Sequence, residues 1–186
     1  MKKIFITVTL TVLATAAKAQ TIFQTGIVTA KQNKYQVVLK KENSKEYVSV
    51  RNINSQLYNA RLKAPSVVIS NPEIIGLKVD KNQINEIIKE SLGPGLFQEL
   101  LKNPKNFIDI DFRFGQDGLI KEVFFFFPSN LAITPQMIEN IETRLKEKLK
   151  ARFDERTIPN FNGPVYKTMS YIPFYYSLDS HSLEVK

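Results

Sequence analysis

Hydrophobic and polar positions alternate most regularly along residues 107–114, which read FIDIDFRF. Neighbouring side chains of a β-strand point to opposite faces, so this stretch predicts a strand with one apolar and one charged face. A turn-forming sequence, GQDG at 115–118, and a second apolar run, LIKEVFFFF at 119–127, follow it. Together the three segments predict a β-hairpin.

The second strand of this hairpin carries four consecutive phenylalanines, which Pro128 follows. Alternation places Phe124 and Phe126 on one sheet face and Phe125 and Phe127 on the other. Burying two phenylalanine side chains contributes about 3–6 kcal/mol, so the pair that faces away from the neighbouring helix also requires a cover. That cover is the first half of the chain, a second copy of the protein, or a different partner.

Residues 134–150 predict an amphipathic helix, with Thr134 as its N-cap and Pro135 in its first turn. Its apolar residues fall within an arc of about 120°: Met137, Ile138, Ile141, Leu145 and Leu149. The charged residues outside this arc are Glu139, Glu142, Lys146, Glu147 and Lys150. The helix is therefore expected to lay one apolar stripe on the hairpin.

The first half of the chain shows short apolar runs separated by polar breaks. They predict strands at residues 22–30, 35–40, 47–50, 66–70 and 74–79, with a hairpin turn at 41–45. Helical spacing of apolar residues follows at 82–92 and, after Gly93-Pro94-Gly95, a shorter helix at 96–101. At the other end of the chain, residues 165–178 predict an extended segment in which Pro173 indicates an edge position or a bulge.

These elements predict an α+β protein. An antiparallel, β-rich N-terminal half (20–103) ends in one or two short helices, and a hairpin–helix–strand domain (104–180) follows it. The polar stretch at 102–106 is the predicted boundary, and residues 181–186 form a tail.

The second half resembles the C-terminal domain of the TonB family over about residues 104–178. The matching pieces are IDIDF at 108–112, Asp117-Gly118, Val123, the helix from Pro135, NGPV at 162–165 and PFYYSL at 173–178. The resemblance implies the fold of that domain. It does not extend to energy transduction, because the chain has a cleavable leader and lacks the proline-rich spacer of a TonB protein.

The N-terminus reads as a signal peptide. Lys2 and Lys3 precede the uncharged run 4–17, and small residues stand at the cleavage positions in Ala17-Lys18-Ala19. Cleavage after Ala19 removes three of the 26 basic residues and leaves 23 against 18 acidic ones, a net charge of +5. We therefore expect an exported protein, periplasmic or secreted, without a transmembrane segment in the mature chain. Its scattered, modest charge disfavours nucleic acid as a partner.

The side chains available for catalysis are few. The sequence has no cysteine, and its one histidine, His181, lies in the polar tail. Zinc sites normally take at least three His or Cys ligands, so such a site is excluded, and no cofactor is expected. Asp109 and Asp111 share a strand face about 6.5–7 Å apart, which suits a carboxylate pair, although a solvated strand face explains them as well.

The aromatic residues suggest a binding surface instead. Tyr171 and Tyr175 fall on the face opposite Ile172, Phe174 and Tyr176, and aromatic side chains anchor many interfaces. We expect a binding or assembly module that uses a sheet face or edge strand to hold an envelope protein or a second copy. The predicted surface combines Phe125, Phe127, Tyr171 and Tyr175, provided that these four share one face. The alternative function is a hydrolase that uses Asp109 and Asp111.

Overall fold

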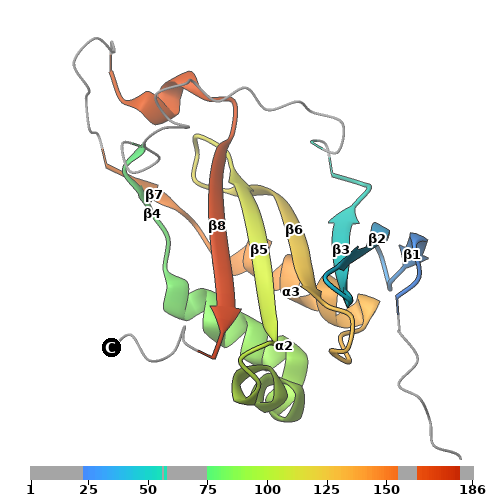
Figure 1. The fold of residues 1–186 in the computed structure, drawn as a ribbon. Helices are drawn as coiled ribbons and strands as arrows, with labels where there is room; N and C mark the ends of the chain where they lie inside the picture. Colours follow the sequence, from blue (N-terminus) through green and yellow to red (C-terminus); the bar gives the residue numbers. More distant parts are fainter. Residues whose placement is uncertain (1–22, 56, 58–74, 155–162, 181–186) are drawn as a thin grey trace, which may run out of the picture.

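The computed structural model describes residues 23–55, 57, 75–154 and 163–180 (Figure 1). The predicted leader at 1–19, the predicted strand at 66–70 and the tail with His181 lie outside the described residues. No helix in the described part of the chain is both long and apolar enough to cross a membrane.

Six antiparallel strands form the main sheet. In spatial order they are β1 (Gly26–Thr29), β2 (Lys34–Glu42), β3 (Lys45–Asn52), β6 (Ile120–Pro128), β5 (Phe107–Phe114) and β8 (Ile172–Asp179). Strand β3 pairs with β6 and so joins the two halves of the chain in one sheet. The predicted boundary at 102–106 therefore does not separate two sheets, because strands from both halves belong to the same sheet. Strand β8 is an edge strand, as Pro173 indicated.

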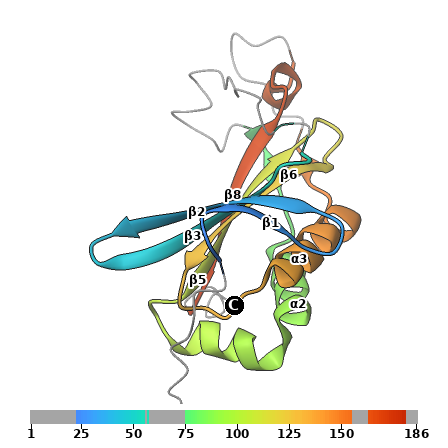
Figure 2. The same cartoon turned by 90° about the vertical axis from the view of Figure 1, so that its right-hand side faces the viewer.

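Two helices, α2 (Lys81–Lys102) and α3 (Pro135–Lys148), cover one face of this sheet (Figure 2). Helix α2 contains non-helical backbone at Gly93 (φ 75°, ψ 163°), so the two helices predicted at 82–92 and 96–101 form its two parts. The remaining elements are a two-stranded sheet of β4 (Leu77–Lys78) and β7 (Arg152–Phe153), and a 3-10 helix, η2 (Val165–Thr168). The expected mixed α+β architecture with an antiparallel sheet is confirmed. The last extended segment is shorter than predicted, because η2 occupies its start.

The predicted β5–β6 hairpin is present, and its register fixes which side chains share a face. Asp109 lies opposite Phe126 and Asp111 opposite Phe124, with a register shift between Arg113 and Phe114. The turn depends on Gly118, whose φ is 76°. A Cβ atom there would lie 2.2 Å from the carbonyl oxygen of Ala151, so no other residue fits.

The core lies between the helices and the sheet. Its β5 contribution is Ile108, Ile110, Phe112 and Phe114, and its β6 contribution includes Val123, Phe125 and Phe127. Phe23, which precedes β1, packs its ring edge against Phe127 at a centroid distance of 5.7 Å. Phe125 and Phe127 are thus the inner pair of the four-phenylalanine run, at 1 % and 0 % exposure.

Helix α3 begins as its sequence indicated, because the Thr134 hydroxyl accepts a hydrogen bond from the Met137 amide at 3.2 Å. The predicted apolar stripe faces the core. The charged side of the helix differs from the prediction, since Glu139 and Glu142 are buried. Helical periodicity places both residues outside the apolar arc, so they were expected to face solvent. They are buried because this side of α3 packs against the first three strands.

Glu139 holds the loop between β1 and β2. Its carboxylate accepts hydrogen bonds from the backbone amides of Lys31, Gln32 and Asn33 at 2.6–2.8 Å. Burial raises the pKa of the Glu139 carboxyl, but these backbone bonds outweigh it, and the pKa lies below its ordinary value. One carboxylate therefore satisfies three successive backbone donors in a loop that makes no sheet pairing there.

Glu142, one turn further along α3, holds β2 and β3. It accepts hydrogen bonds from the buried Tyr35 hydroxyl (2.8 Å) and from Asn52 Nδ2 (3.1 Å), and it forms an ion pair with Lys146 at 2.6 Å. Burial, followed by the negative charge of Glu142, raises the pKa of Tyr35, so this hydroxyl remains a donor. The first three strands are thus attached to α3 by two carboxylates.

We expect Glu139→Gln to lower the free energy of unfolding at neutral pH by about 2–3 kcal/mol, because buried amides lose a charged acceptor. Urea denaturation measures this change. The control is Glu147→Gln, an exposed residue of the same helix, which should change the stability by less than about 0.5 kcal/mol. Equal effects of the two substitutions would contradict the role of Glu139.

The difference between the wild type and Glu139→Gln also depends on pH. A carboxylate whose folded-state pKa is lowered stabilises the fold fully above its unfolded pKa, here near 4.5, and loses this contribution as the pH falls through the folded value. The difference in unfolding free energy should therefore be constant near neutral pH and shrink below pH 4.5. A difference that stays unchanged at about pH 3 would overturn this assignment.

Candidate functional site

The main sheet has an open face, which is the face opposite α2 and α3 (Figure 2). Its central side chains come from β3, β6, β5 and β8, as the strand register and burial pattern show. They are Tyr47, Ser49, Arg51, Glu122, Phe124, Phe126, Phe107, Asp109, Asp111, Arg113, Tyr175 and Ser177. Phe124 and Phe126 are half-buried at its centre.

Phe124 is covered by two cations. The guanidinium carbon of Arg51 lies 4.4 Å from the ring centroid and that of Arg113 lies 4.9 Å from it. Glu122, which is 0 % exposed, holds both arginines, with Oε1 2.9 Å from Arg51 Nε and Oε2 3.3 Å from Arg113 Nε. The Glu122 carboxylate offsets the repulsion between the two guanidinium groups. These groups partly shield the Phe124 ring from water.

Phe126 is covered by aromatic neighbours. Tyr47 stacks on it at a centroid distance of 5.2 Å and an interplanar angle of 23°. Phe107 lies 5.9 Å from Phe126 and 6.0 Å from Tyr47, so the three rings form one cluster. The ammonium of Lys40 lies 5.9 Å from the Phe126 centroid. Tyr47 and Arg51 both belong to β3, so the first half of the chain supplies much of the cover for the outer phenylalanines.

The predicted binding set does not share one face. Phe125 and Phe127 point into the core, which excludes them from an exposed surface, and Tyr171 precedes β8 rather than lying in it. Only Tyr175 lies on the open face, where it is 61 % exposed. Phe124 and Phe126 lie on the open face, where Phe125 and Phe127 were expected. The expected partition of β8 is confirmed for Ile172 and Tyr176, which are buried.

A shallow hollow of about 350 Å³ lies on the open face. Phe124 and Phe126 form its apolar floor. Its rim is polar: Lys40, Ser49, Asp109, Asp111 and Tyr175. An apolar floor with a few polar groups at the margin is typical of surfaces that bind a ligand. This hollow is the candidate functional site.

Asp109 and Asp111 are adjacent on the rim but differ in their surroundings. Asp109 Oδ1 accepts a hydrogen bond from the Ser177 hydroxyl at 2.6 Å. Partial burial, followed by the interaction with the Asp109 carboxylate, raises the pKa of the Tyr175 hydroxyl to about 12. Burial raises the pKa of Asp111, and the positive charge of Arg113 offsets part of the increase. Asp109 is therefore tied to β8, whereas no hydrogen bond from a described residue restrains Asp111 in the same way.

Sequence reasoning missed Arg51 and Glu122 as parts of this face. The available signal was Glu122 itself, since a carboxylate within an apolar strand requires a buried cation. Its two partners lie on different strands, 71 and nine positions away along the chain. Only the pairing of β3 with β6 brings Arg51 to it.

Neither a comparison with protein-family models nor one with curated proteins gives a match. Among solved structures, the chain resembles a DUF5043 family protein from Bacteroides uniformis, with a TM-score of 0.61 and 15 % sequence identity. The similarity covers 87 % of this chain and 89 % of that one. At this identity it shows a shared fold and nothing about function.

We expect Glu122→Gln to lower the free energy of unfolding by about 3 kcal/mol, because two guanidiniums then face each other without their buried counter-charge. Chemical denaturation with the wild type as reference measures the loss. Glu86→Gln is the control, since it breaks an exposed ion pair with Lys89, and should change the stability by at most about 0.5 kcal/mol. A Glu122→Gln variant as stable as this control would refute the account of how Phe124 is covered.

Proposed function

We propose that this protein is an exported envelope protein and acts as a non-enzymatic binding module through its open sheet face. The observation that carries this proposal is the hollow with Phe124 and Phe126 at its floor and Asp109, Asp111 and Tyr175 at its rim. These residues lie on three adjacent strands whose opposite faces are packed against the core. The hollow is thus mounted on a rigid support, which favours binding over a purely structural role.

The rim suggests what kind of ligand the hollow accepts. Two carboxylates on β5 are hydrogen-bond acceptors for a ligand, and the exposed Tyr175 adds an aromatic wall. Lys40 stands on the opposite rim as a single cation. A ligand that places donor groups, such as hydroxyl or ammonium, against Asp111 and an apolar surface on the phenylalanines satisfies both parts of the site.

The fold of the second half is proposed to be TonB-C-like. The support is the order of β5, β6, α3 and β8 together with the edge position of β8. An edge strand offers unpaired backbone groups to a partner, so β8 provides a second route for assembly beside the open face. Tyr175 belongs to this strand and therefore links the two surfaces.

Export rests on the leader-like segment at 1–19. The protein recovered from the cell envelope should begin at Gln20, as intact-mass measurement and N-terminal sequencing will show. Recovery of a chain that retains residues 1–19 would contradict both cleavage and the proposed location.

Site-directed photo-crosslinking tests the binding surface. Benzoyl-phenylalanine replaces Tyr175 in one variant and Asn140, an exposed residue of α3, in another. Irradiation of the intact envelope should give a discrete adduct from position 175 and none from position 140. The absence of an adduct at 175, or the same adduct at both positions, would refute the open face as the binding surface. Mass spectrometry distinguishes a second copy of this chain from a different partner.

A further inference from the structure

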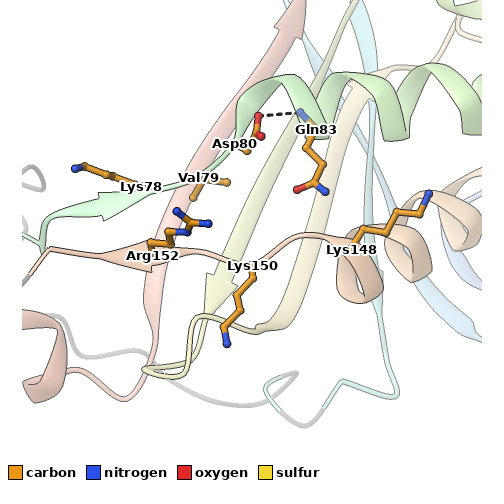
Figure 3. A pocket seen from close by; sticks show the side chains of 7 residues that line it. All are labelled: Lys78, Val79, Asp80, Gln83, Lys148, Lys150 and Arg152. Atoms are coloured by element: carbon orange, nitrogen blue, oxygen red, sulfur yellow. Dashed lines mark hydrogen bonds between the residues drawn. The ribbon is translucent and has the colours of Figure 1, made fainter.

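A larger hollow of about 660 Å³ lies on another part of the molecule, where the ends of several elements meet (Figure 3). It adjoins β4, the start of α2, the end of α3 and β7. Its lining residues are Lys78, Val79, Asp80, Gln83, Lys148, Lys150 and Arg152. Four of the seven are cations: Lys148, Lys150 and Arg152 belong to one segment, and Lys78 belongs to β4.

Two of the four cations of this hollow have carboxylate partners among the described residues. The one carboxylate of the lining, Asp80, caps helix α2 by accepting the Gln83 amide at 3.1 Å. Lys78 pairs with Asp154 at 3.0 Å, and Lys148 lies 4.0 Å from Glu90. Within the described part of the chain, Lys150 and Arg152 have no carboxylate within ion-pair distance.

Backbone contacts on both sides hold the segment that carries these cations. The Ala151 amide donates to the Gly118 carbonyl, and the Asp154 amide donates to the Gly76 carbonyl, each at 2.9 Å. The segment is extended, and the buried residues Leu149 and Ala151 alternate with the exposed cations. The close approach at Gly118 thus fixes a strip of outward-facing positive charge.

The spacing of the strip follows from strand geometry. Lys148 ends helix α3, and Lys150 and Arg152 follow it at alternate positions of the extended segment. The Cα atoms of successive cations are therefore about 6.5–7 Å apart. Lys78 lies directly opposite Arg152 in the β4–β7 pair. Like charges at directly opposed positions destabilise strand pairing, and an anion bound between them reverses this effect.

The directions of the side chains argue against a site for one small anion. A single phosphate is held by donors that converge on one point. Figure 3 shows the side chains of Lys78, Lys148 and Lys150 extending away from one another. Charges spread along a strip match a ligand whose own charges are spread along a chain.

We propose that the strip of Lys148, Lys150 and Arg152, with Lys78 opposite, binds a linear polyanion whose phosphoryl groups repeat along its length. Each phosphoryl group engages one or two cations, and the hollow accommodates the backbone of the ligand. This site is separate from the open face, so an experiment can refute either proposal and leave the other intact. A free polyphosphate chain and a phosphate-bearing polymer of the envelope present the same chemistry to it.

Titration calorimetry of the full chain with short-chain inorganic polyphosphate tests the proposal at physiological ionic strength. The wild type should bind saturably, and the double variant Lys150→Gln, Arg152→Gln should bind at least about tenfold more weakly. The control variant, Lys41→Gln with Lys45→Gln, removes the same charge from the exposed tip of the β2–β3 hairpin. It should retain binding within about twofold. Circular dichroism confirms that both variants fold.

Three outcomes would overturn the proposal. If polyphosphate does not bind saturably, the proposed site does not exist. If both double variants weaken binding equally, the binding depends on net charge and not on the strip. Orthophosphate that competes as well as polyphosphate, at matched phosphate concentration, indicates a point site rather than a strip. If polyphosphate does not bind, a further arm with anionic phospholipid vesicles tests a different class of partner. Binding to vesicles alone would replace the linear polyanion with a lipid surface.

Discussion

The structure depends on strand β6, which carries phenylalanines on both faces while lying near the middle of an open sheet. Helices cover only one face, so the inner pair, Phe125 and Phe127, is buried in the ordinary way. The outer pair is partly covered by side chains from β3 and β5, the two strands that flank β6. This requirement explains why Glu122 is buried: without its charge, the two arginines over Phe124 would repel each other.

Buried carboxylates also attach the first three strands to the rest of the molecule. Glu139 and Glu142 lie on the side of α3 that a periodicity analysis assigns to solvent. They instead satisfy backbone amides of the β1–β2 loop and the polar side chains Tyr35 and Asn52. In both places a carboxylate from one half of the chain meets donors from the other half. Burial of these carboxylates therefore ties the two halves together.

Much of the fold could be predicted from the sequence because its signals are local. The β5–β6 hairpin, the Thr134 cap and the edge position of Pro173 each follow from residues within one element. The choice between the two phenylalanine pairs was harder, because it depends on the register across the turn, which shifts at Arg113 and Phe114. A shift of one position exchanges the faces.

The sequence predicted individual members of the candidate site but not their combination. Alternation placed Asp109 with Asp111 on one face of β5, and Tyr175 opposite Tyr176 on β8, as the structure has them. The predicted grouping of Tyr175 with Phe125 and Phe127 was wrong, because these two phenylalanines are buried in the core. The remaining members of the site come from β3, and the pairing of β3 with β6 leaves no local trace in the sequence. The pairs that define the site, such as Arg51 with Glu122, are 71 positions apart.

The central claim is that a ligand covers the open face in the envelope. The chain has no cysteine, so Ser49→Cys on the rim of the hollow and Asn140→Cys on α3 each introduce a unique thiol. The measurement is the rate of maleimide labelling of each thiol, in the purified protein and in the intact envelope. We predict that the envelope slows labelling at position 49 much more than at position 140. Equal slowing at the two positions would contradict the account.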